Sequence, residues 1–406
     1  MRVLLISHTC QSRTEGQPKA DRLGRLPGVQ LRVLVPDRWK RYGAWRSAEP
    51  AVSDAFEYEV GRVRWPWAGQ AQTYLHHYPG LRRLLETYRP DVIDLWEEPW
   101  SLVSAHAARL RAACLPSARL VCETEQNLDK ALPPPFEAFR RYTLRRADYL
   151  VGRSREAVAV ARHKGYAGPA GVVPNAFDES VFHPRDRAAC RRAWGVDGFV
   201  VGYAGRLDAS KGVADLLAAV ARLPRAATLL LAGDGPDRAA FSTLADALGV
   251  ADRVRFLGGR PPAELAGLIN ALDALVLPSR TTPRWKEQFG RVIIEAHGCG
   301  VPVIGSDSGA IPDVVGEGGL IVPEADPAAL AHALDRLAAS PELAAELGRK
   351  GRTRALAHCT WQRVAERMHG IYHELRGPRE SAEPDVREPT SIDAPHSTEP
   401  LAETLR

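Results

Sequence analysis

The chain alternates short apolar runs with longer amphipathic stretches. The runs at 3–7, 31–35, 200–204 and 274–277 are almost wholly apolar, which is typical of parallel strands that are buried on both faces. Segments with helical spacing of apolar residues follow most of these runs, and Gly or Pro residues separate the two kinds of element. This alternation predicts an α/β fold with parallel sheets, and 406 residues are enough for two domains with full cores.

One β-loop-α-β unit spans residues 278–315. A polar loop containing Pro follows the strand at 274–277, a helix begins after Gly290, and Gly and Pro residues at 298–302 end that helix before the next strand. Gly290 has no Cβ to keep a ligand away from the backbone, and the helix start presents free N–H groups and the positive end of the dipole. The unit therefore predicts a phosphate site.

Two carboxylates flank this predicted phosphate site. Glu287 lies in the loop before the helix, and Glu295 lies about one and a half turns inside it. The first carboxylate can face a neutral polyol while the second accepts hydrogen bonds from a diol, which predicts a sugar on one side and a ribose on the other. The residues alone also allow Glu287 to be a solvated loop charge and Glu295 an exposed helix residue.

A second loop, at 205–212, carries two cations after the strand at 200–204. In open α/β sheets, ligands bind at such carboxyl ends of strands. Arg206 offers a planar fork to phosphate oxygens and Lys211 a point charge. The plain alternative, two surface cations at a helix start, fits poorly because the helix dipole disfavours positive charge there. The loop therefore predicts a diphosphate held without a divalent metal, and no D-x-D metal motif is evident.

Together these motifs resemble a known family. They read GRLDASKG at 205–212, E-x7-E within KEQFGRVIIE at 286–295, and CGVPVIGSDSGAIPDVV at 299–315. This combination resembles the retaining glycosyltransferases of family 4, which have the GT-B fold. The resemblance implies two Rossmann-like domains facing across a cleft, with a C-terminal helix that crosses back to the N-terminal domain. It also implies transfer of a sugar from a nucleotide-diphosphate donor with retention at the anomeric carbon.

The resemblance also implies roles for single residues. Arg206 and Lys211 would hold the diphosphate, and Glu295 the ribose hydroxyls. Glu287 would contact the donor sugar, while backbone at Phe289–Gly290 meets the distal phosphate and backbone near Gly259–Arg260 meets the base. The expected donor-binding set is Gly205, Arg206, Lys211, Gly233, Gly259, Arg260, Glu287, Phe289, Gly290, Arg291 and Glu295. Arg206, Lys211 and Glu287 are assigned to catalysis, and no metal or other cofactor is expected.

Candidate acceptor residues follow strands in the N-terminal half. They are His8 and Thr9 after the first strand, Glu97 and Glu98 after a strand ending at Trp96, and Gln126, Asn127 and Lys130 after a strand ending at Cys122. The two acids could equally be helix N-terminal residues that complement the dipole. This chain departs from the family here: it lacks the Gly-rich loop after the first strand and the His after the later one. Gln126, Asn127 and Lys130 occupy positions near that missing His.

The predicted domain organisation has four parts. Residues 1–180 form an acceptor domain, 181–358 a nucleotide-sugar donor domain and 359–376 the returning helix, with the interdomain crossing at 184–198. Residues 377–406 are rich in Pro, Glu and Ser and are expected to be disordered.

Composition and charge indicate the class of protein and the compartment in which it would work. The chain is 45% hydrophobic and 25% charged, as in soluble globular proteins, and has no apolar run near the ~20 residues that span a bilayer. Its six Cys are scattered, which favours thiols in a reducing cytoplasm. The net charge is +5, but the tail holds three Arg against seven Asp or Glu, which leaves +9 on residues 1–376. This charge suits anionic nucleotide sugars and peripheral contact with an anionic inner membrane face, whereas no nucleic-acid motif is found.

Two basic segments could supply such a membrane contact. They are the basic and aromatic stretch 35–46 and a helix at 136–146 that carries Arg140, Arg141, Arg145 and Arg146. Two edge strands with ordinary exposed Arg, and a solvated helix face, are the alternatives that we favour.

The sequence therefore predicts a hexosyltransferase. It would move a sugar from a UDP-, GDP- or ADP-sugar to a hydroxyl of a glycan or glycolipid acceptor, in the family's usual setting of cell-surface polysaccharide or glycolipid synthesis. A non-catalytic nucleotide-sugar-binding partner subunit and a GT-B nucleotide-sugar epimerase are the alternatives. The missing His and Gly pair favour the partner subunit, whereas the intact Glu287, Arg206 and Lys211 count against it.

Overall fold

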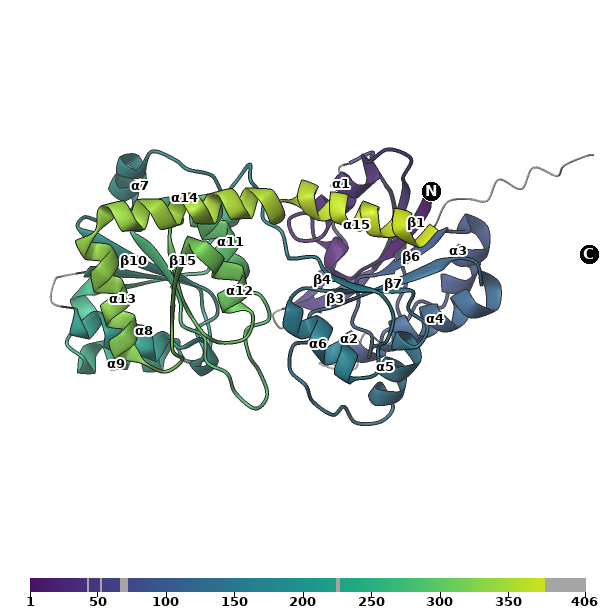
Figure 1. The fold of residues 1–406 in the computed structure, drawn as a ribbon, viewed down its shortest axis with the longest axis horizontal. Helices are drawn as coiled ribbons and strands as arrows, with labels where there is room; N and C mark the ends of the chain where they lie inside the picture. The colour runs from purple at the N-terminus through teal and green to yellow at the C-terminus, as the bar shows by residue number, and fades with distance from the viewer. Residues whose placement is uncertain (42–43, 52, 66–71, 224–226, 377–406) are drawn as a thin grey trace, which may run out of the picture.

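Two parallel-sheet domains lie side by side, and one long helical segment runs along both of them (Figure 1). The computed structural model describes residues 1–41, 44–51, 53–65, 72–223 and 227–376. The tail that we predicted to be disordered, 377–406, lies outside these residues. No helix among the described residues combines the length and apolar character that crossing a bilayer requires.

The N-terminal sheet has seven parallel strands in the order β5-β2-β1-β6-β7-β8-β9. Its strands are β1 (Arg2–Ile6), β2 (Gln30–Pro36), β5 (Glu57–Gly61), β6 (Val92–Leu95), β7 (Arg119–Thr124), β8 (Tyr149–Gly152) and β9 (Ala170–Val172). Its helices are α1 (Gln17–Gly24), α2 (Gln72–Leu75), α3 (Leu81–Tyr88), α4 (Leu102–Cys114), α5 (Phe136–Leu144) and α6 (Arg155–His163), with a 3-10 turn η1 (Thr9–Gln11). Side chains alternate across the sheet: Leu4 and Ile6 join the core on one face, and Val3 and Leu5 the core on the other.

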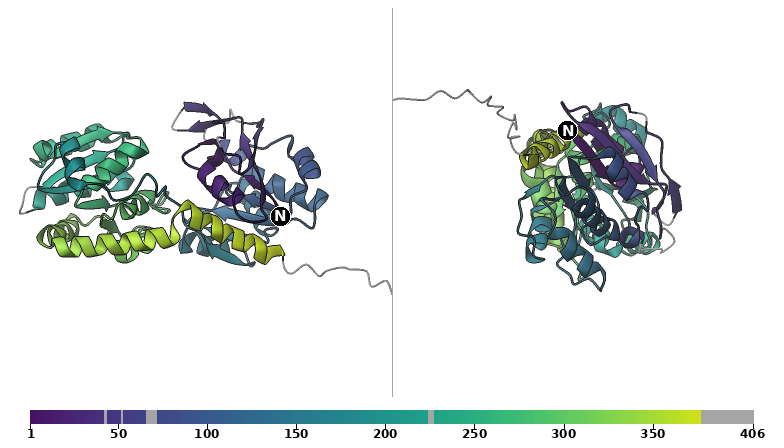
Figure 2. Two further views of the ribbon diagram at one scale, coloured as in Figure 1. Left: turned by 90° about the horizontal axis from the view of Figure 1, so that it is seen from above. Right: turned by 90° about the vertical axis from the view of Figure 1, so that its right-hand side faces the viewer.

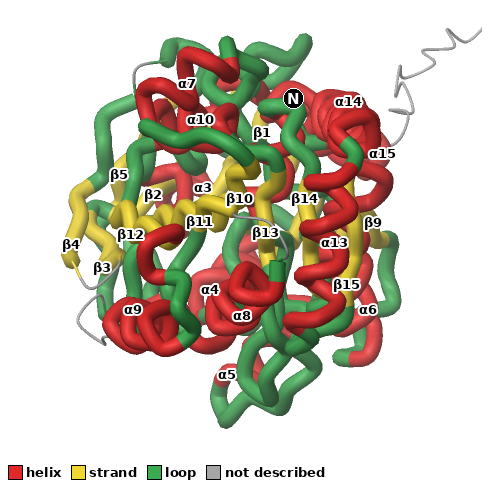
Figure 3. Tube along the Cα trace, turned by 90° about the vertical axis from the view of Figure 1, so that its left-hand side faces the viewer, coloured by secondary structure: helices red, strands yellow, loops and turns green. Residues whose placement is uncertain are grey.

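The C-terminal sheet has six parallel strands in the order β12-β11-β10-β13-β14-β15. Its strands are β10 (Phe199–Ala204), β11 (Ala227–Ala232), β12 (Val254–Gly258), β13 (Ala274–Leu277), β14 (Val303–Ser306) and β15 (Gly319–Val322). Its helices are α7 (Arg187–Trp194), α8 (Val213–Arg222), α9 (Arg238–Ala247), α10 (Pro262–Ala271), α11 (Arg291–Gly298), α12 (Ile311–Val315), α13 (Pro327–Ala339) and α14 (Pro341–His358), with 3-10 turns η3 (Ala209–Lys211), η4 (Ala251–Arg253) and η5 (Gly316–Gly318). Helix α8 packs beside α9 and α13, and α10 beside α7 and α11, so that helices surround the strands (Figure 3).

Both sheets reverse their strand order at one point. The reversal falls between β1 and β6 in the N-terminal sheet, and between β10 and β13 in the C-terminal sheet. At such a point the two neighbouring crossovers leave in opposite directions and open a crevice at the carboxyl ends of the strands. The fold therefore creates one candidate ligand crevice in each domain.

The last helix, α15 (Trp361–Arg376), returns to the N-terminal domain, as predicted (Figure 2). Its apolar side chains, among them Val364 and Met368, are buried in the same core as Val3 and Val121 of the N-terminal sheet. The predicted two-domain Rossmann-like architecture with a crossing helix is thus confirmed.

Two local predictions change. The stretch 184–198, expected to be a crossing, contains α7, which packs on α10. The basic segment 35–46 does form strands, β3 (Arg38–Arg41) and β4 (Ala44–Ser47), but they pair with each other as an antiparallel hairpin and not with the main sheet.

Candidate active site

The loop after β10 is fastened to the neighbouring strand end at the C-terminal switch point. Gly212 has a φ of +67°, and a Cβ added there would lie 1.8 Å from the Pro278 carbonyl oxygen. Only glycine combines this left-handed conformation with so close a backbone approach. The packing fixes Lys211, the residue before Gly212, beside the residues that follow β13.

Lys211 and Glu287, which the sequence assigned to catalysis, lie together. Lys211 Nζ donates to Glu287 Oε2 at 2.8 Å, and the ammonium lies 4.1 Å from the centroid of the Trp285 ring. Ser279 Oγ donates to the same carboxylate oxygen at 3.0 Å. The Glu287 side chain is thus held by two donors at the edge of the crevice. Ser279 was missed in the sequence, although a polar residue directly after a buried strand is the signal that would have found it.

Arg206 is placed differently from Lys211. Its side chain is 68% exposed, with Nε 3.4 Å from Asp208 Oδ2, and its carbonyl accepts a hydrogen bond from Tyr203 Oη at 2.6 Å. The backbone of the loop is therefore anchored while the guanidinium extends into solvent. This leaves the guanidinium able to move toward an anion at the end of β10.

The helix that carries the second predicted carboxylate begins at the expected position. Gly290 is the N-cap of α11 with a φ of +78° and has no side-chain cap, and Arg291 is the first helical residue. Glu295 is half-buried one turn further on; burial raises its pKa, and the charge of Arg291 opposes that rise. The side chain of Phe289, just before the N-cap, is buried.

Other members of the predicted donor set make contacts within the protein. A Cβ at Gly233 would lie 1.8 Å from the Gly205 carbonyl oxygen, so this glycine allows the loops after β10 and β11 to stack on each other. Arg260 pairs with Glu264 at 3.2 Å, whereas a Cβ at Gly259 would meet open space. Gly233, which we had grouped with the donor residues, is therefore in close contact with the protein's own backbone.

A cavity of about 460 Å³ lies on the N-terminal side of the cleft. It is lined by His8, Thr9, Gln11, Ser12, Glu15, Trp39, Arg46, Ser47, Glu49, Trp96, Glu125, Asn175, Ala176, Arg291 and Trp361. Arg291, which we had grouped with the donor residues, is contributed by the other domain. The mixture of Trp faces with hydroxyl, amide and charged groups suits a polyhydroxylated ligand.

His8 is held rigidly in the wall of this cavity. Its Nδ1 lies 2.8 Å from Glu97 Oε2, its backbone N–H donates to Glu97 Oε1 at 2.7 Å, and its ring stacks on Trp39 at 4.7 Å. Burial opposes the ionisation of Glu97, but the charge of His8 and its hydrogen bonds outweigh that effect and lower the pKa of the carboxyl. Glu97 is 3% exposed and orients His8 from behind, which differs from the direct contact with the acceptor that we predicted.

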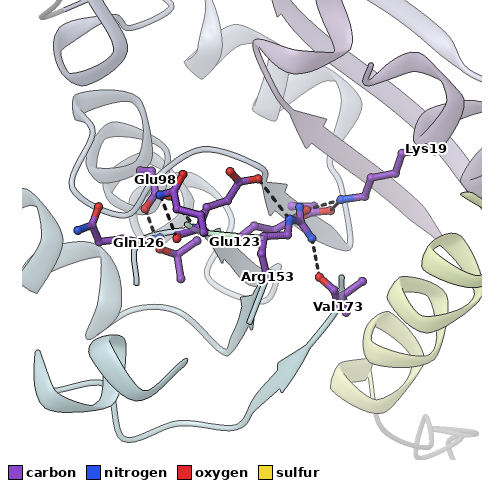
Figure 4. Close-up of polar contacts among 10 residues, drawn as sticks. Lys19, Glu98, Glu123, Gln126, Arg153 and Val173 are labelled. Carbon is purple, nitrogen blue, oxygen red and sulfur yellow. Dashed lines mark hydrogen bonds and ion pairs between the residues drawn. The ribbon is translucent and has the colours of Figure 1, made fainter. Parts of the chain in front are cut away.

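Glu98 also has protein partners. Its carboxylate accepts hydrogen bonds from Thr124 Oγ1 at 2.7 Å and from the Glu125 backbone N–H at 2.8 Å, and it lies near Gln126 (Figure 4). Burial, which outweighs these hydrogen bonds, raises its pKa to about 7. Glu98 thus holds the end of β7, and neither Glu97 nor Glu98 lines the cavity.

The raised pKa of Glu98 predicts a pH dependence. Because the folded protein binds this proton more tightly than the unfolded chain, the contribution of Glu98 to the free energy of unfolding falls as pH rises from about 4.5 to above 7. Glu98→Gln keeps both hydrogen bonds, since the Thr124 hydroxyl can turn to accept, and it has no such titration. Urea unfolding should therefore show the variant gaining stability relative to the wild type between pH 5 and pH 8. A constant difference across this range would contradict the prediction.

Asn127 joins the two domains. Its Nδ2 donates to the Glu287 carbonyl at 2.8 Å and to Glu156 Oε2 at 3.1 Å, while Lys286 Nζ donates to Glu156 Oε1 at 2.7 Å. Gln288 Nε2 donates to the Glu125 carbonyl at 3.1 Å in the same contact. Asn127, predicted as an acceptor-side residue, is therefore a buried bridge that holds the Glu287 loop on the N-terminal domain. Gln126 donates to Leu128 and the Lys130 carbonyl accepts from Arg140, so these two also have protein partners.

Within the described residues, no group of three or more His, Cys, Asp or Glu is arranged to hold a metal ion. The six cysteines are free thiols.

Comparison with known proteins agrees with this geometry. Residues 186–354 match the model of the glycosyl transferases group 1, and residues 20–181 match that of glycosyltransferase family 4. A D-inositol 3-phosphate glycosyltransferase from Corynebacterium jeikeium is 32% identical over 320 residues, 71% of each chain. A protein of the same name from Streptomyces bingchenggensis is 32% identical over 382 residues, 87% of this chain and 77% of that relative.

Among solved structures, sucrose-phosphate synthase from Thermosynechococcus elongatus superposes with a TM-score of 0.71 at 25% identity, over 92% of this chain and 99% of that one. The match therefore extends across both domains and is not confined to the motif-bearing half. The chain belongs to the family 4 glycosyltransferases with the GT-B fold, as its motifs predicted.

Proposed function

We propose that this protein is a retaining hexosyltransferase that binds a nucleotide-diphosphate sugar on its C-terminal domain. The observation that carries the proposal is the contact of Lys211 and Ser279 with Glu287 at the switch point of the C-terminal sheet. A diphosphate would draw the Lys211 ammonium from Glu287, and Arg206 would close from solvent onto the same oxygens. Glu287 would then accept hydrogen bonds from the donor sugar, and Glu295 from the ribose.

The proposed reaction breaks the bond between the anomeric carbon and the phosphate oxygen and forms a bond to the acceptor oxygen on the same face. The acceptor hydroxyl proton passes to the departing phosphate oxygen. Negative charge grows on the leaving diphosphate, where Lys211, Arg206 and the amide end of α11 at Gly290 stabilise it. These groups supply the role that a divalent metal would otherwise have, so we propose that none is required.

The acceptor hydroxyl would enter the cavity beside His8. The relatives described above act, by their names, on D-inositol 3-phosphate, a ring with several hydroxyls and one phosphate. The cavity offers Trp faces for a ring, and Arg46 and Arg291 for a phosphate. We therefore propose a polyhydroxylated ring, free or at the end of a glycan or glycolipid, as the acceptor.

For the setting we propose the cytoplasm, with peripheral contact at an anionic membrane face during cell-surface polysaccharide or glycolipid synthesis. Support comes from the β3–β4 hairpin, which carries Arg38 and Lys40 on one strand and an exposed Trp45 on the other. By contrast, Arg140, which we had placed on a basic face of α5, is buried and bonded to Glu137. The hairpin is thus the better candidate for this contact.

His8→Asn should separate acceptor binding from donor binding. Asn Nδ2 can replace His8 Nδ1 as the donor to Glu97, so the carboxylate keeps its partner while the ring edge in the cavity is lost. We expect the acceptor KM to rise about tenfold, the value of one hydrogen bond of ~1.4 kcal/mol, with little change in the donor KM. Two-substrate kinetics would measure both constants, and Gln126→Ala is the control because its amide is bonded to Leu128. An unchanged acceptor KM would place the acceptor elsewhere.

The experiment that tests the proposed function begins with thermal-shift screening against UDP-, GDP- and ADP-sugars. The stabilising donor is then incubated with inositol, inositol phosphates, monosaccharides and lipid-linked sugars, and NMR of the product gives the anomeric configuration. A product with inverted configuration would refute retention. Conversion of the donor alone to an epimer would favour the epimerase, and donor binding without turnover would favour a partner subunit.

A further inference from the structure

A second cavity, of about 260 Å³, lies where the two domains meet the turn between α14 and α15. Arg153 and Arg155 contribute from the N-terminal domain, Asp313 and Phe289 from the donor domain, and Arg354 and Arg367 from the two long helices. In Figure 1 this turn is the point where the long helical segment passes from one domain to the other. The cavity shares no lining residue with the 460 Å³ cavity that contains His8.

Cationic side chains outnumber acidic ones around this 260 Å³ cavity, which we call the hinge cavity. Arg153 is balanced by its buried pair with Glu123. The other three guanidinium groups face one carboxylate among the lining residues, Asp313, whose Oδ1 lies 4.0 Å from Arg155. Positive charge therefore accumulates at a wall shared by both domains.

The hydrogen bonds of these arginines do not neutralise them. Arg354 Nη2 donates to the Asp313 backbone carbonyl at 2.7 Å, and Arg367 Nη2 donates to His358 Nδ1 at 2.9 Å. Since a guanidinium can only donate, His358 accepts at Nδ1. Burial and the charges of Arg367 and Arg354 lower the pKa of His358, in agreement with a positive local potential.

A helix end adds to this potential. Ser154 caps α6 by accepting from the Ala157 N–H, and both Ser154 and Arg155 line the cavity. The positive end of the dipole of this nine-residue helix thus lies at the same wall as the arginines. Guanidinium forks beside a helix N-terminus are the combination that binds phosphate oxygens well.

We propose that the hinge cavity binds a small phosphate-bearing anion. Its volume is below the ~300 Å³ at which pockets begin to hold drug-sized ligands, so a phosphate monoester or a diphosphate fits better than a nucleotide. The anion would be held by Arg155, Arg354 and Arg367.

Such an anion would stabilise one arrangement of the two domains. It contacts all of its ligands only while the N-terminal domain, the donor domain and the returning helices keep the positions seen here. Phe289 links the site to the donor crevice, because it lines the hinge cavity and the next residue, Gly290, is the N-cap of α11. Anion and donor should therefore change each other's affinity by the same factor.

The test uses calorimetric titration with inorganic phosphate, pyrophosphate and glucose 6-phosphate at constant ionic strength. The full chain carries Arg206→Gln and Lys211→Gln, so that the proposed donor phosphate site does not contribute. We expect one saturable site, and we expect Arg155→Gln with Arg367→Gln to weaken it at least tenfold. Arg349→Gln with Arg376→Gln is the matched pair on α14 and α15, outside the lining residues of the cavity, and should have no effect.

Equal losses in both pairs, or no saturable binding before they are introduced, would overturn the proposal. Arg155→Gln alone is the second variant, because this side chain is 84% exposed and its replacement should not affect folding; it should weaken binding severalfold. Tighter binding of glucose 6-phosphate than of phosphate would identify a sugar phosphate, and equal affinities would identify phosphate itself. Both results support the site, and neither depends on whether the enzyme turns over a donor.

Discussion

Lys211→Ala is expected to lower kcat by about 100- to 1,000-fold at saturating donor, the usual loss when one preorganised donor to a developing anion is removed. Lys211 is the cation that the fold fixes most firmly at the crevice, through Gly212 and the contact with Glu287. Glu287 keeps the Ser279 hydroxyl as a partner, so the free energy of unfolding should change far less than the activity. Steady-state kinetics and urea unfolding of the same preparation would measure both effects.

Arg206→Ala and Arg284→Ala are the second test variant and the control for this result. Arg206 is 68% exposed, so its replacement should leave stability within about 0.5 kcal/mol of the wild type while still lowering kcat strongly. Arg284 is an exposed cation in the same loop as Glu287, and its loss should affect neither quantity. Wild-type kcat in the Lys211 or Arg206 variant, or an equal loss in the Arg284 variant, would remove the proposed role of this crevice in binding the diphosphate.

The sequence predicted the crevice well because its parts are local. Lys211 and Glu287 each follow a buried apolar strand within a few residues of a glycine, and parallel strands bring their carboxyl ends to one edge of a sheet. Short-range signals therefore located both groups. Their pairing depended only on β10 and β13 being neighbours, as the Rossmann strand order requires.

The sequence did not predict hydrogen bonds between residues that lie far apart in the chain. Asn127 was expected on the acceptor side, but its amide is bonded to a carbonyl 160 residues away across the cleft. Glu97 was expected to face a ligand and instead holds His8. A side chain at a strand end can point into the crevice or back into the protein, and residue type alone does not distinguish these directions.

Helix α7 was not predicted either, although the residues that begin and end it can be recognised in the sequence. Asp186 caps it by accepting from the N–H groups of Ala188 and Ala189, and Gly195 ends it in the left-handed conformation. An Asp followed eight or nine residues later by Gly around a polar segment is a usual helix pattern. The segment was assigned to the crossing because it has few apolar residues, which reflects its exposed position beside α10.

Four ionisable side chains buried under the returning helix decide the other large effect. Arg153 and Lys19 both pair with Glu123 (Figure 4). Lys19 Nζ also lies 3.7 Å from Asp94 Oδ2. All four side chains are at most 2% exposed, and Tyr372 of α15 donates to Asp94 at 2.6 Å. Burial opposes the ionisation of Glu123, but the charges of Arg153 and Lys19 outweigh it and hold the pKa of the carboxyl well below its usual value. The network joins α15 to the carboxyl ends of β6 and β7, beside the cavity that contains His8.

Arg153→Met should therefore destabilise the protein by about 3–5 kcal/mol at pH 7, because it removes the guanidinium from the buried Glu123 and leaves Glu123 and Asp94 with Lys19 as their one remaining cation in the network. In the wild type, the lowered pKa of Glu123 gives stability that is present above pH ~4.5 and is lost as pH falls. Without Arg153 the pKa of Glu123 rises, so the difference in free energy of unfolding between variant and wild type should narrow as the pH falls. Adding Glu123→Gln to Arg153→Met should restore part of the stability lost at pH 7. Urea unfolding at several pH values measures these differences, with the exposed Arg155→Met as control, expected within about 0.5 kcal/mol of the wild type. A deficit below about 1 kcal/mol at pH 7, or one that does not change with pH, would show that Lys19 alone neutralises the buried carboxylates.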